Sequence, residues 1–150
     1  MPGAADATDP RTLVHRWFTE LFNEGTLAVA DEILADDISY RGPRSLSPTD
    51  VTSPHDVKEY VETYRQAFPD LTYTVEELFD AEDAIIARWS VAGTHENALF
   101  ELESSGESFV EEGINIFVIE DGRISEVWSE WDTLKMVQEL DVTPVGTTNR

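Results

Sequence analysis

The chain has 150 residues, of which 31 are acidic and 10 are basic, so its formal net charge is −21, and it contains no cysteine. This length fits one domain with a core and a small-molecule pocket, and the lack of cysteine excludes a disulfide framework and thiolate chemistry. Nucleic acid and anionic membranes both require a basic face on the protein, so we expect neither as a partner.

The acidic residues are spread along the whole chain, and the basic residues include two lysines, Lys58 and Lys135. This pattern is typical of a salt-adapted protein, whose surface repels itself at low ionic strength. The alternative is an ordinary acidic protein, against which the shortage of lysine counts. Apolar runs stay well below the ~18 residues that span a bilayer, and the N-terminus lacks the regions of a signal peptide. We therefore expect a soluble cytoplasmic protein.

The first half of the chain predicts three helices. Asp9 and Pro10 form a helix start, and apolar pairs then recur at helical spacing up to residue 22. A shorter helix follows Thr26, and a third begins at the capping residue Ser53. The inward stripes of these two helices are Leu27, Ala30, Ile33 and Leu34, and Val57, Tyr60, Val61, Tyr64 and Phe68. Residues 1–10 are expected to form a flexible lead, and residues 42–54 a loop.

The second half predicts strands. Short extended segments are expected at Ile38–Arg41 and residues 71–75, and a longer strand at Ala84–His95, followed by an irregular segment over 96–108. The strongest signal is Asp121-Gly122 between the apolar runs 114–119 and 124–131, which predicts a tight hairpin. A short helix with Leu134, Val137 and Leu140 on one side follows, and then a flexible tail over residues 141–150.

Helices that precede a run of strands favour an α+β fold. We expect a cone-shaped barrel over residues 11–140, in which a curved antiparallel sheet wraps around the three helices, with a short helix at the C-terminal end. The apolar mouth of such a cone can hold a small hydrophobic or aromatic molecule.

Several short segments carry a resemblance to a known family. They are Phe22-Asn23-Glu24-Gly25, Ala67-Phe68-Pro69-Asp70-Leu71, Gly93-Thr94-His95, Gly113-Ile114-Asn115-Ile116-Phe117 and Ile119-Glu120-Asp121-Gly122-Arg123-Ile124, followed by Trp128 and Asp132. With them the sequence resembles the SnoaL-like polyketide cyclase (ester cyclase) family of the nuclear-transport-factor-2-like superfamily. The resemblance implies a cofactor-free cyclase, isomerase or hydrolase that works by acid/base chemistry. The alternative is a non-catalytic ligand-binding or dimerisation module of the same fold.

In the cyclases that this chain resembles, the final strand carries a histidine and, two residues later, an aspartate that acts as general acid/base. These positions correspond here to Val127 and Ser129, and a second pocket histidine corresponds to Asn115. Strand alternation places Ser129 with Val127 and Trp131 on one face. The expected ligand-binding residues are Asn115, Ser129, Phe117, Val127, Trp131, Trp89, Tyr40, Tyr60, Tyr64 and Phe22. The aromatic residues of the helices fit a packed core as well as a pocket mouth.

Three residues are candidates for proton transfer. His95 has an ordinary pKa suited to a general base, although it also fits a histidine that hydrogen-bonds at a strand end. Glu130 would reach the pocket if a bulge turned it inward, and otherwise lies on the outer face. Asp132 precedes the last helix and fits a helix cap. The acid pairs Glu76-Glu77 and Glu111-Glu112 are interpreted as surface charge.

No metal-ligand spacing and no glycine-rich phosphate loop occurs in the sequence, so we expect no metal and no cofactor. Alternation also places Trp128 and Ile124 on the convex face of the sheet. Apolar side chains on an outer face require a partner, which predicts a homodimer formed through this face.

Overall fold

The computed structural model describes residues 9–43, 46, 50–99 and 102–140. Its elements in chain order are α1 (Pro10–Arg16), the π-helix η1 (Trp17–Asn23), α2 (Val29–Ile33), β1 (Leu34–Arg41), α3 (Pro54–Ala67), β2 (Thr72–Asp80), β3 (Ala84–Thr94), β4 (Ser108–Glu120), β5 (Arg123–Trp131) and α4 (Thr133–Leu140). The α+β class is confirmed. Apart from Asp9 and Pro10, the predicted lead and tail lie outside the described residues.

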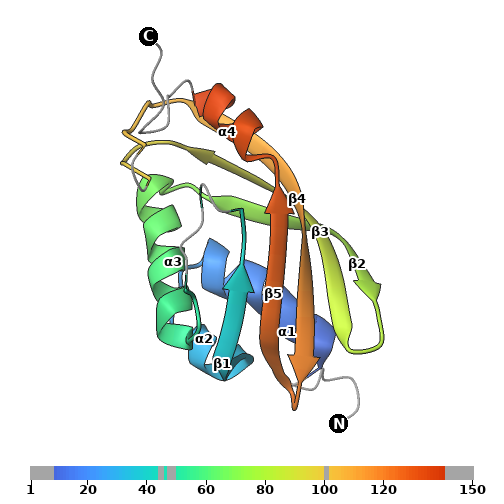
Figure 1. Cartoon of the computed structure of the whole chain (residues 1–150). Helices are drawn as coiled ribbons and strands as arrows, with labels where there is room; N and C mark the ends of the chain where they lie inside the picture. The colour runs from blue at the N-terminus through green and yellow to red at the C-terminus, as the bar shows by residue number, and fades with distance from the viewer. Residues whose placement is uncertain (1–8, 44–45, 47–49, 100–101, 141–150) are drawn as a thin grey trace.

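The five strands form one curved sheet in the order β1-β5-β4-β3-β2 (Figure 1). The sheet is open, with β1 and β2 at its edges, so the expected barrel does not close within the described residues. The neighbours among β2 to β5 are antiparallel, but β1 pairs with β5 in the parallel direction. The expectation of a purely antiparallel sheet is therefore wrong at one edge, because hairpin signals say nothing about how a distant strand joins a sheet.

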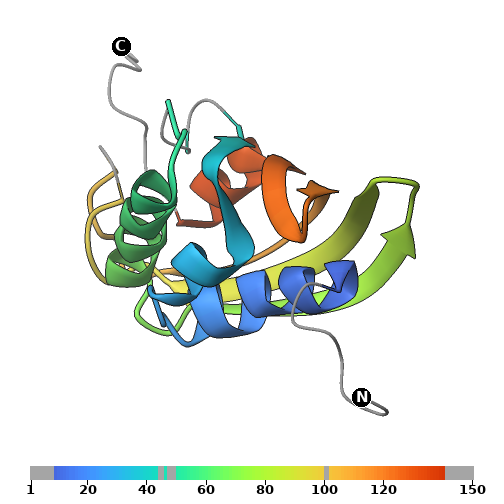
Figure 2. The same cartoon turned by 90° about the horizontal axis from the view of Figure 1, so that it is seen from below.

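The helices α1, η1, α2 and α3 pack on one face of the sheet, and α4 crosses its far end (Figures 1 and 2). The first and third helices begin as predicted. Oδ2 of Asp9 accepts a hydrogen bond from the backbone N–H of Thr12, and Oγ of Ser53 accepts one from the N–H of Asp56. In chain order, α1 is continued by the wider turns of η1, whose buried side chains are Trp17, Phe18, Leu21 and Phe22.

The predicted hairpin is confirmed, with Asp121 and Gly122 both at positive φ (52° and 74°) as a tight turn requires. Ser125 is an extra residue in β5, because the register moves from Ile119–Ile124 to Val118–Glu126. This bulge turns Ile124 into the core, where it is fully buried, so its expected place beside Trp128 on the convex face is wrong.

Further differences from the sequence-based expectation concern element boundaries and one helix face. Leu34 opens β1 instead of ending a helix, and β4 begins at Ser108, inside the segment expected to be irregular. On α4 the buried residues are Met136 and Leu140, whereas Leu134 is exposed. The predicted stripe is therefore correct at Leu140 and at the partly buried Val137, and wrong at Leu134.

Candidate functional site

The inner face of the sheet carries the neutral polar groups that strand alternation and the family resemblance together predicted there. Asn115 and Ser129 are direct partners across β4 and β5, and Phe117 and Val127 form the next inward pair. All four are buried. The indole Nε1 of Trp89 donates a 3.0 Å hydrogen bond to Oδ1 of Asn115, so the amide oxygen of Asn115 already has a partner within the protein.

The predicted tyrosines lie inside the molecule with the aromatic residues of η1. The hydroxyl groups of Tyr40 and Tyr60 are 2.8 Å apart, and Phe22 packs edge-on against Tyr60. The hydroxyl of Tyr64 donates to the carbonyl of Leu46 at 2.5 Å. Burial raises the pKa of Tyr60 and of Tyr64 well above the ordinary tyrosine value. These hydroxyl groups therefore keep their protons at neutral pH and can act there only as neutral hydrogen-bonding groups.

A narrow cavity lies in the interior beneath α4. It is lined by Tyr64, Leu71, Tyr73, Trp89, Val91, Phe109, Trp131 and Met136. Its volume is about 10 Å³, which is room for about one water molecule. Met136 is the lining residue that α4 contributes, and Trp131 is the one that β5 contributes. Side chains of the protein thus fill most of the space at this end of the interior.

His95 follows β3 and is fully buried. Its ring packs on Phe68, with centroids 5.4 Å apart, and Phe68 in turn contacts Phe109 of the cavity wall. Nδ1 lies 3.2 Å from Oγ of Ser105, whereas Nε2 has no hydrogen-bond partner in the described part of the chain. Burial lowers the pKa of His95, so the imidazole is neutral at neutral pH. A neutral ring with one unpaired nitrogen can exchange a proton with a bound molecule.

Glu130 and Asp132 do not reach the interior. The β4–β5 register is regular from the Val118–Glu126 pair to the Gly113–Trp131 pair, so Glu130 remains on the outer face opposite Ile114 and is exposed. Its inward placement by a bulge is therefore wrong, since the bulge lies at Ser125. Asp132 is also exposed, and its Oδ1 accepts a hydrogen bond from the N–H of Lys135 at the start of α4. This is the helix-capping role that the sequence also allowed.

Glu111 is the buried acid that the sequence analysis missed. It was interpreted as surface charge, but only 3% of it is exposed, and its Oε2 has no hydrogen-bond partner among the described residues. The signal was available: Glu111 has the same parity as Asn115 and Phe117, so an earlier start of the strand turns it inward. Because the strand was predicted to start at residue 114, Glu111 was not assigned to either face of it.

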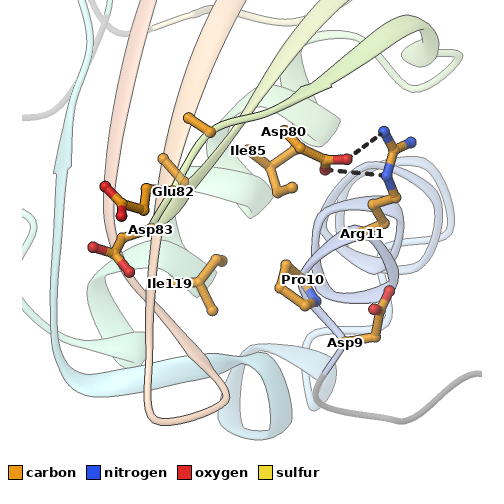
Figure 3. A pocket seen from close by; sticks show the side chains of 10 residues that line it. Asp9, Pro10, Arg11, Asp80, Glu82, Asp83, Ile85 and Ile119 are labelled. Atoms are coloured by element: carbon orange, nitrogen blue, oxygen red, sulfur yellow. Dashed lines mark hydrogen bonds and ion pairs between the residues drawn. The ribbon is translucent and has the colours of Figure 1, made fainter.

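A larger hollow of about 390 Å³ lies between the start of α1 and the β2–β3 turn (Figure 3). Its charged side chains are four carboxylates, Asp9, Asp80, Glu82 and Asp83, and one guanidinium, Arg11. Arg11 is held by both oxygens of Asp80, at 3.2 and 3.0 Å. The hollow is polar and contains none of the predicted site residues.

Within the described residues, no group of three or more potential metal-binding side chains gathers at one place. None of the helices in those residues has the length and apolar character needed to cross a bilayer.

Several solved structures resemble this fold. One is from a Jannaschia species and is proposed to be a SnoaL-like polyketide cyclase. It has a TM-score of 0.80 at 18% identity, covering 90% of this chain and 93% of the other. TsrD from Streptomyces laurentii has a TM-score of 0.77 at 25% identity, with coverage of 91% and 98%. IdmH from Streptomyces antibioticus, which is proposed to be a polyketide cyclase, has a TM-score of 0.75 at 24% identity, with coverage of 89% and 99%.

Among curated proteins, none matches the sequence significantly. The model of the SnoaL-like polyketide cyclase family matches residues 12–140, which is most of the chain and includes every element from η1 to α4. The chain belongs to the SnoaL-like polyketide cyclase family.

Proposed function

We propose that this protein binds a small hydrophobic or aromatic molecule inside its cone and acts on it by proton transfer without a cofactor, as a cyclase, isomerase or hydrolase. The observation that carries the proposal is the inner face of the sheet, where the buried polar groups Asn115, Ser129 and His95 stand among aromatic walls. Apolar walls with a few convergent polar groups are typical of small-molecule sites.

In this proposal His95 is the general base, because its neutral imidazole has an unpaired nitrogen. Asn115 and Ser129 orient the ligand by hydrogen bonds. The apolar walls are supplied by Phe22, Tyr40, Tyr60, Tyr64, Trp89, Phe117, Val127 and Trp131. Glu130 and Asp132 require a different arrangement of β5 to take part, so the proposal does not rely on them.

The narrow cavity must widen for such a ligand. Small-molecule pockets measure about 300–1,000 Å³, against about 10 Å³ here. Met136 is the wall residue contributed by α4, an eight-residue helix at the end of the sheet. We infer that the ligand takes the place of Met136, with α4 moving away from the sheet.

A second candidate is a non-catalytic binding module of the same fold. It is favoured by Val127 and Ser129, which stand where the resembled cyclases carry their proton-transferring pair. Its ligand would be held by the same walls and released unchanged.

Binding is tested by titrating the protein with naphthol, and the quenching of tryptophan fluorescence measures how much naphthol is bound. Val91 lines the cavity and Ala92 points outward. Val91→Phe should therefore weaken naphthol binding at least about tenfold, which corresponds to ~1.4 kcal/mol. Ala92→Phe is the matched control and should leave the affinity unchanged. Absence of saturable binding to the unmodified protein, or equal loss in both variants, contradicts the proposed site.

We also propose that two copies associate through the convex face of the sheet in a salt-rich cytoplasm. Ile114, Ile116 and Trp128 are exposed there, with 42% of Trp128 accessible, and Ile116 and Trp128 are direct cross-strand partners. Trp128→Glu should give a monomer in sedimentation at high salt. Leu134→Glu, on the exposed side of α4, is the control and should keep the dimer. A monomeric unmodified protein contradicts the proposal.

A further inference from the structure

Glu111 lies beside the cavity beneath α4, in strand register with residues that line it. Three inward rows of β3 and β4 follow one another at this end of the sheet: Trp89 with Gly113, Val91 with Glu111, and Gly93 with Phe109. Trp89, Val91 and Phe109 line the cavity. Glu111 therefore occupies the middle row, and it is the titratable member of these rows.

One oxygen of this carboxyl has a structural role. β5 pairs with β4 as far as the Gly113–Trp131 pair, and α4 then contacts β4. Side chains of α4 bond the backbone of Val110 there: Glu139 accepts from its N–H at 3.1 Å and Lys135 donates to its carbonyl at 2.6 Å. Oε1 of Glu111 accepts from the N–H of Glu112 at 3.2 Å in the same way.

The other oxygen has no such role. Oε2 is buried and has no hydrogen-bond partner in the described residues. Buried polar atoms are nearly always hydrogen-bonded, and leaving one unpaired is unfavourable. The hydrogen bond from the N–H of Glu112 needs only one side-chain oxygen at position 111, and the amide oxygen of a glutamine would supply it equally well. This bond therefore accounts for Oε1 of Glu111 but gives no reason for the second, unpaired oxygen Oε2.

We propose that Glu111 is a proton-transferring residue that contacts the molecule bound beneath α4. The inference rests on the proposed function, and it adds a second titratable group to the one proposed there, His95. The matching ligand is a small, largely apolar molecule with an acidic C–H beside an electron-withdrawing group. The carboxylate removes this proton as an O–H bond forms at Oε2 and the C–H bond breaks. The electron pair enters the conjugated system of the ligand, and return of the same proton to another ligand atom completes an isomerisation.

The charges around Glu111 are compatible with this role. Burial raises the pKa of its carboxyl, and the N–H of Glu112 and the ammonium of Lys135 partly offset this. Lys135 is itself paired with Glu139 at 2.7 Å, while Asp132 and Glu139 also raise the pKa of Glu111. On the β3 side its neighbour is the apolar Val91. A carboxyl with a raised pKa is a stronger base once ionised than an exposed one.

The test uses a nitrobenzisoxazole, a planar aromatic probe whose single acidic C–H is removed by a base while its N–O bond breaks to give a coloured cyanophenolate. The unmodified protein should accelerate this elimination, and the rate should rise with pH through one ionisation above the ordinary glutamate value. Glu111→Gln keeps the oxygen that bonds Glu112 and should lower the rate at least about tenfold. Glu111→Asp keeps the carboxyl and should retain the pH dependence at a reduced rate. Glu112→Gln, on the exposed face of the same strand, is the control and should not change the rate of elimination.

The two proposals fail differently. If the unmodified protein and Glu111→Gln both bind naphthol but eliminate the probe at the same rate, Glu111 is not the base and the binding function stands. If the rate falls equally in Glu111→Gln and Glu112→Gln, the effect is one of surface charge and the inference is overturned. If naphthol does not bind to the unmodified protein, the proposed function falls and this inference falls with it.

Discussion

The indole of Trp89 and the amide of Asn115 are joined by a 3.0 Å hydrogen bond between two buried side chains on neighbouring strands. The indole N–H is a donor only, and the amide oxygen is the acceptor that satisfies it. This bond holds a ring of the cavity wall against the central pair of strands. The position of the Trp89 ring in the cavity wall therefore depends on this one hydrogen bond.

Removing the acceptor should destabilise the protein. Asn115→Leu keeps a similar side-chain size but leaves Nε1 of Trp89 buried without a partner, so the free energy of unfolding should fall by about 1–3 kcal/mol. Urea unfolding at constant salt measures it. Trp89→Phe removes the donor, and in that background Asn115→Leu should cost less than it does alone. Additive effects of the two substitutions would show that the bond contributes nothing.

Gly113 leaves the space that the Trp89 ring occupies. A Cβ at this glycine would lie 2.3 Å from Cζ2 of Trp89 and 2.8 Å from the carbonyl oxygen of Glu130. Gly113→Ala should thus lower the free energy of unfolding by about 1–3 kcal/mol through overpacking. Trp89→Phe removes the nearer contact but not the backbone one, so the penalty should shrink in that background without vanishing. An unchanged urea midpoint for Gly113→Ala contradicts this close packing.

Local chemistry predicted much of the fold. Asp9, Ser53 and the Asp121-Gly122 turn each act over a few residues, and the structure has a helix start or a hairpin at each of them. The helix starts and the turn were predicted correctly because hydrogen bonds and backbone angles within four residues decide them. Strand alternation grouped Asn115 with Phe117 and Ser129 with Val127, and the family resemblance indicated that these residues face inward.

The remainder depends on contacts between distant segments. The parallel pairing of β1 depends on which edge of the sheet is open. The bulge at Ser125 reversed the expected side of Ile124. Glu111 was missed because Glu-Glu pairs in an acidic chain suggest surface charge, and because α4, which contacts its strand β4, is distant in the chain from it.

The charge of the chain predicts a strong dependence of stability on salt. With a net charge of −21, repulsion between carboxylates opposes the folded state, and raising KCl from about 0.1 M to about 1 M shortens the screening length from ~10 Å to ~3 Å. The thermal midpoint should therefore rise with KCl. A variant with Asp37→Asn, Glu62→Gln and Glu103→Gln, all exposed positions, should show a smaller rise. Equal slopes for the two proteins would mean that salt does not act through surface repulsion.

Burial of His95 predicts a loss of stability on the acid side of neutrality. Its pKa is lowered in the folded protein, so below the ordinary value of about 6.5 the unfolded chain binds a proton that the folded protein does not. The free energy of unfolding should then fall with decreasing pH, by at most ~1.4 kcal/mol per pH unit, until the folded pKa is reached. His95→Gln should remove this component of the slope.

Glu111, whose pKa is raised, contributes to the pH dependence of the unfolding free energy with the opposite sign, because its folded form keeps a proton that the unfolded chain loses as pH rises. Subtracting the pH profile of the unfolding free energy of His95→Gln, measured by urea unfolding, from that of the unmodified protein isolates the contribution of the histidine. If His95→Gln keeps the full slope, the imidazole is accessible to protons in the folded state, and its role as a buried neutral base cannot hold.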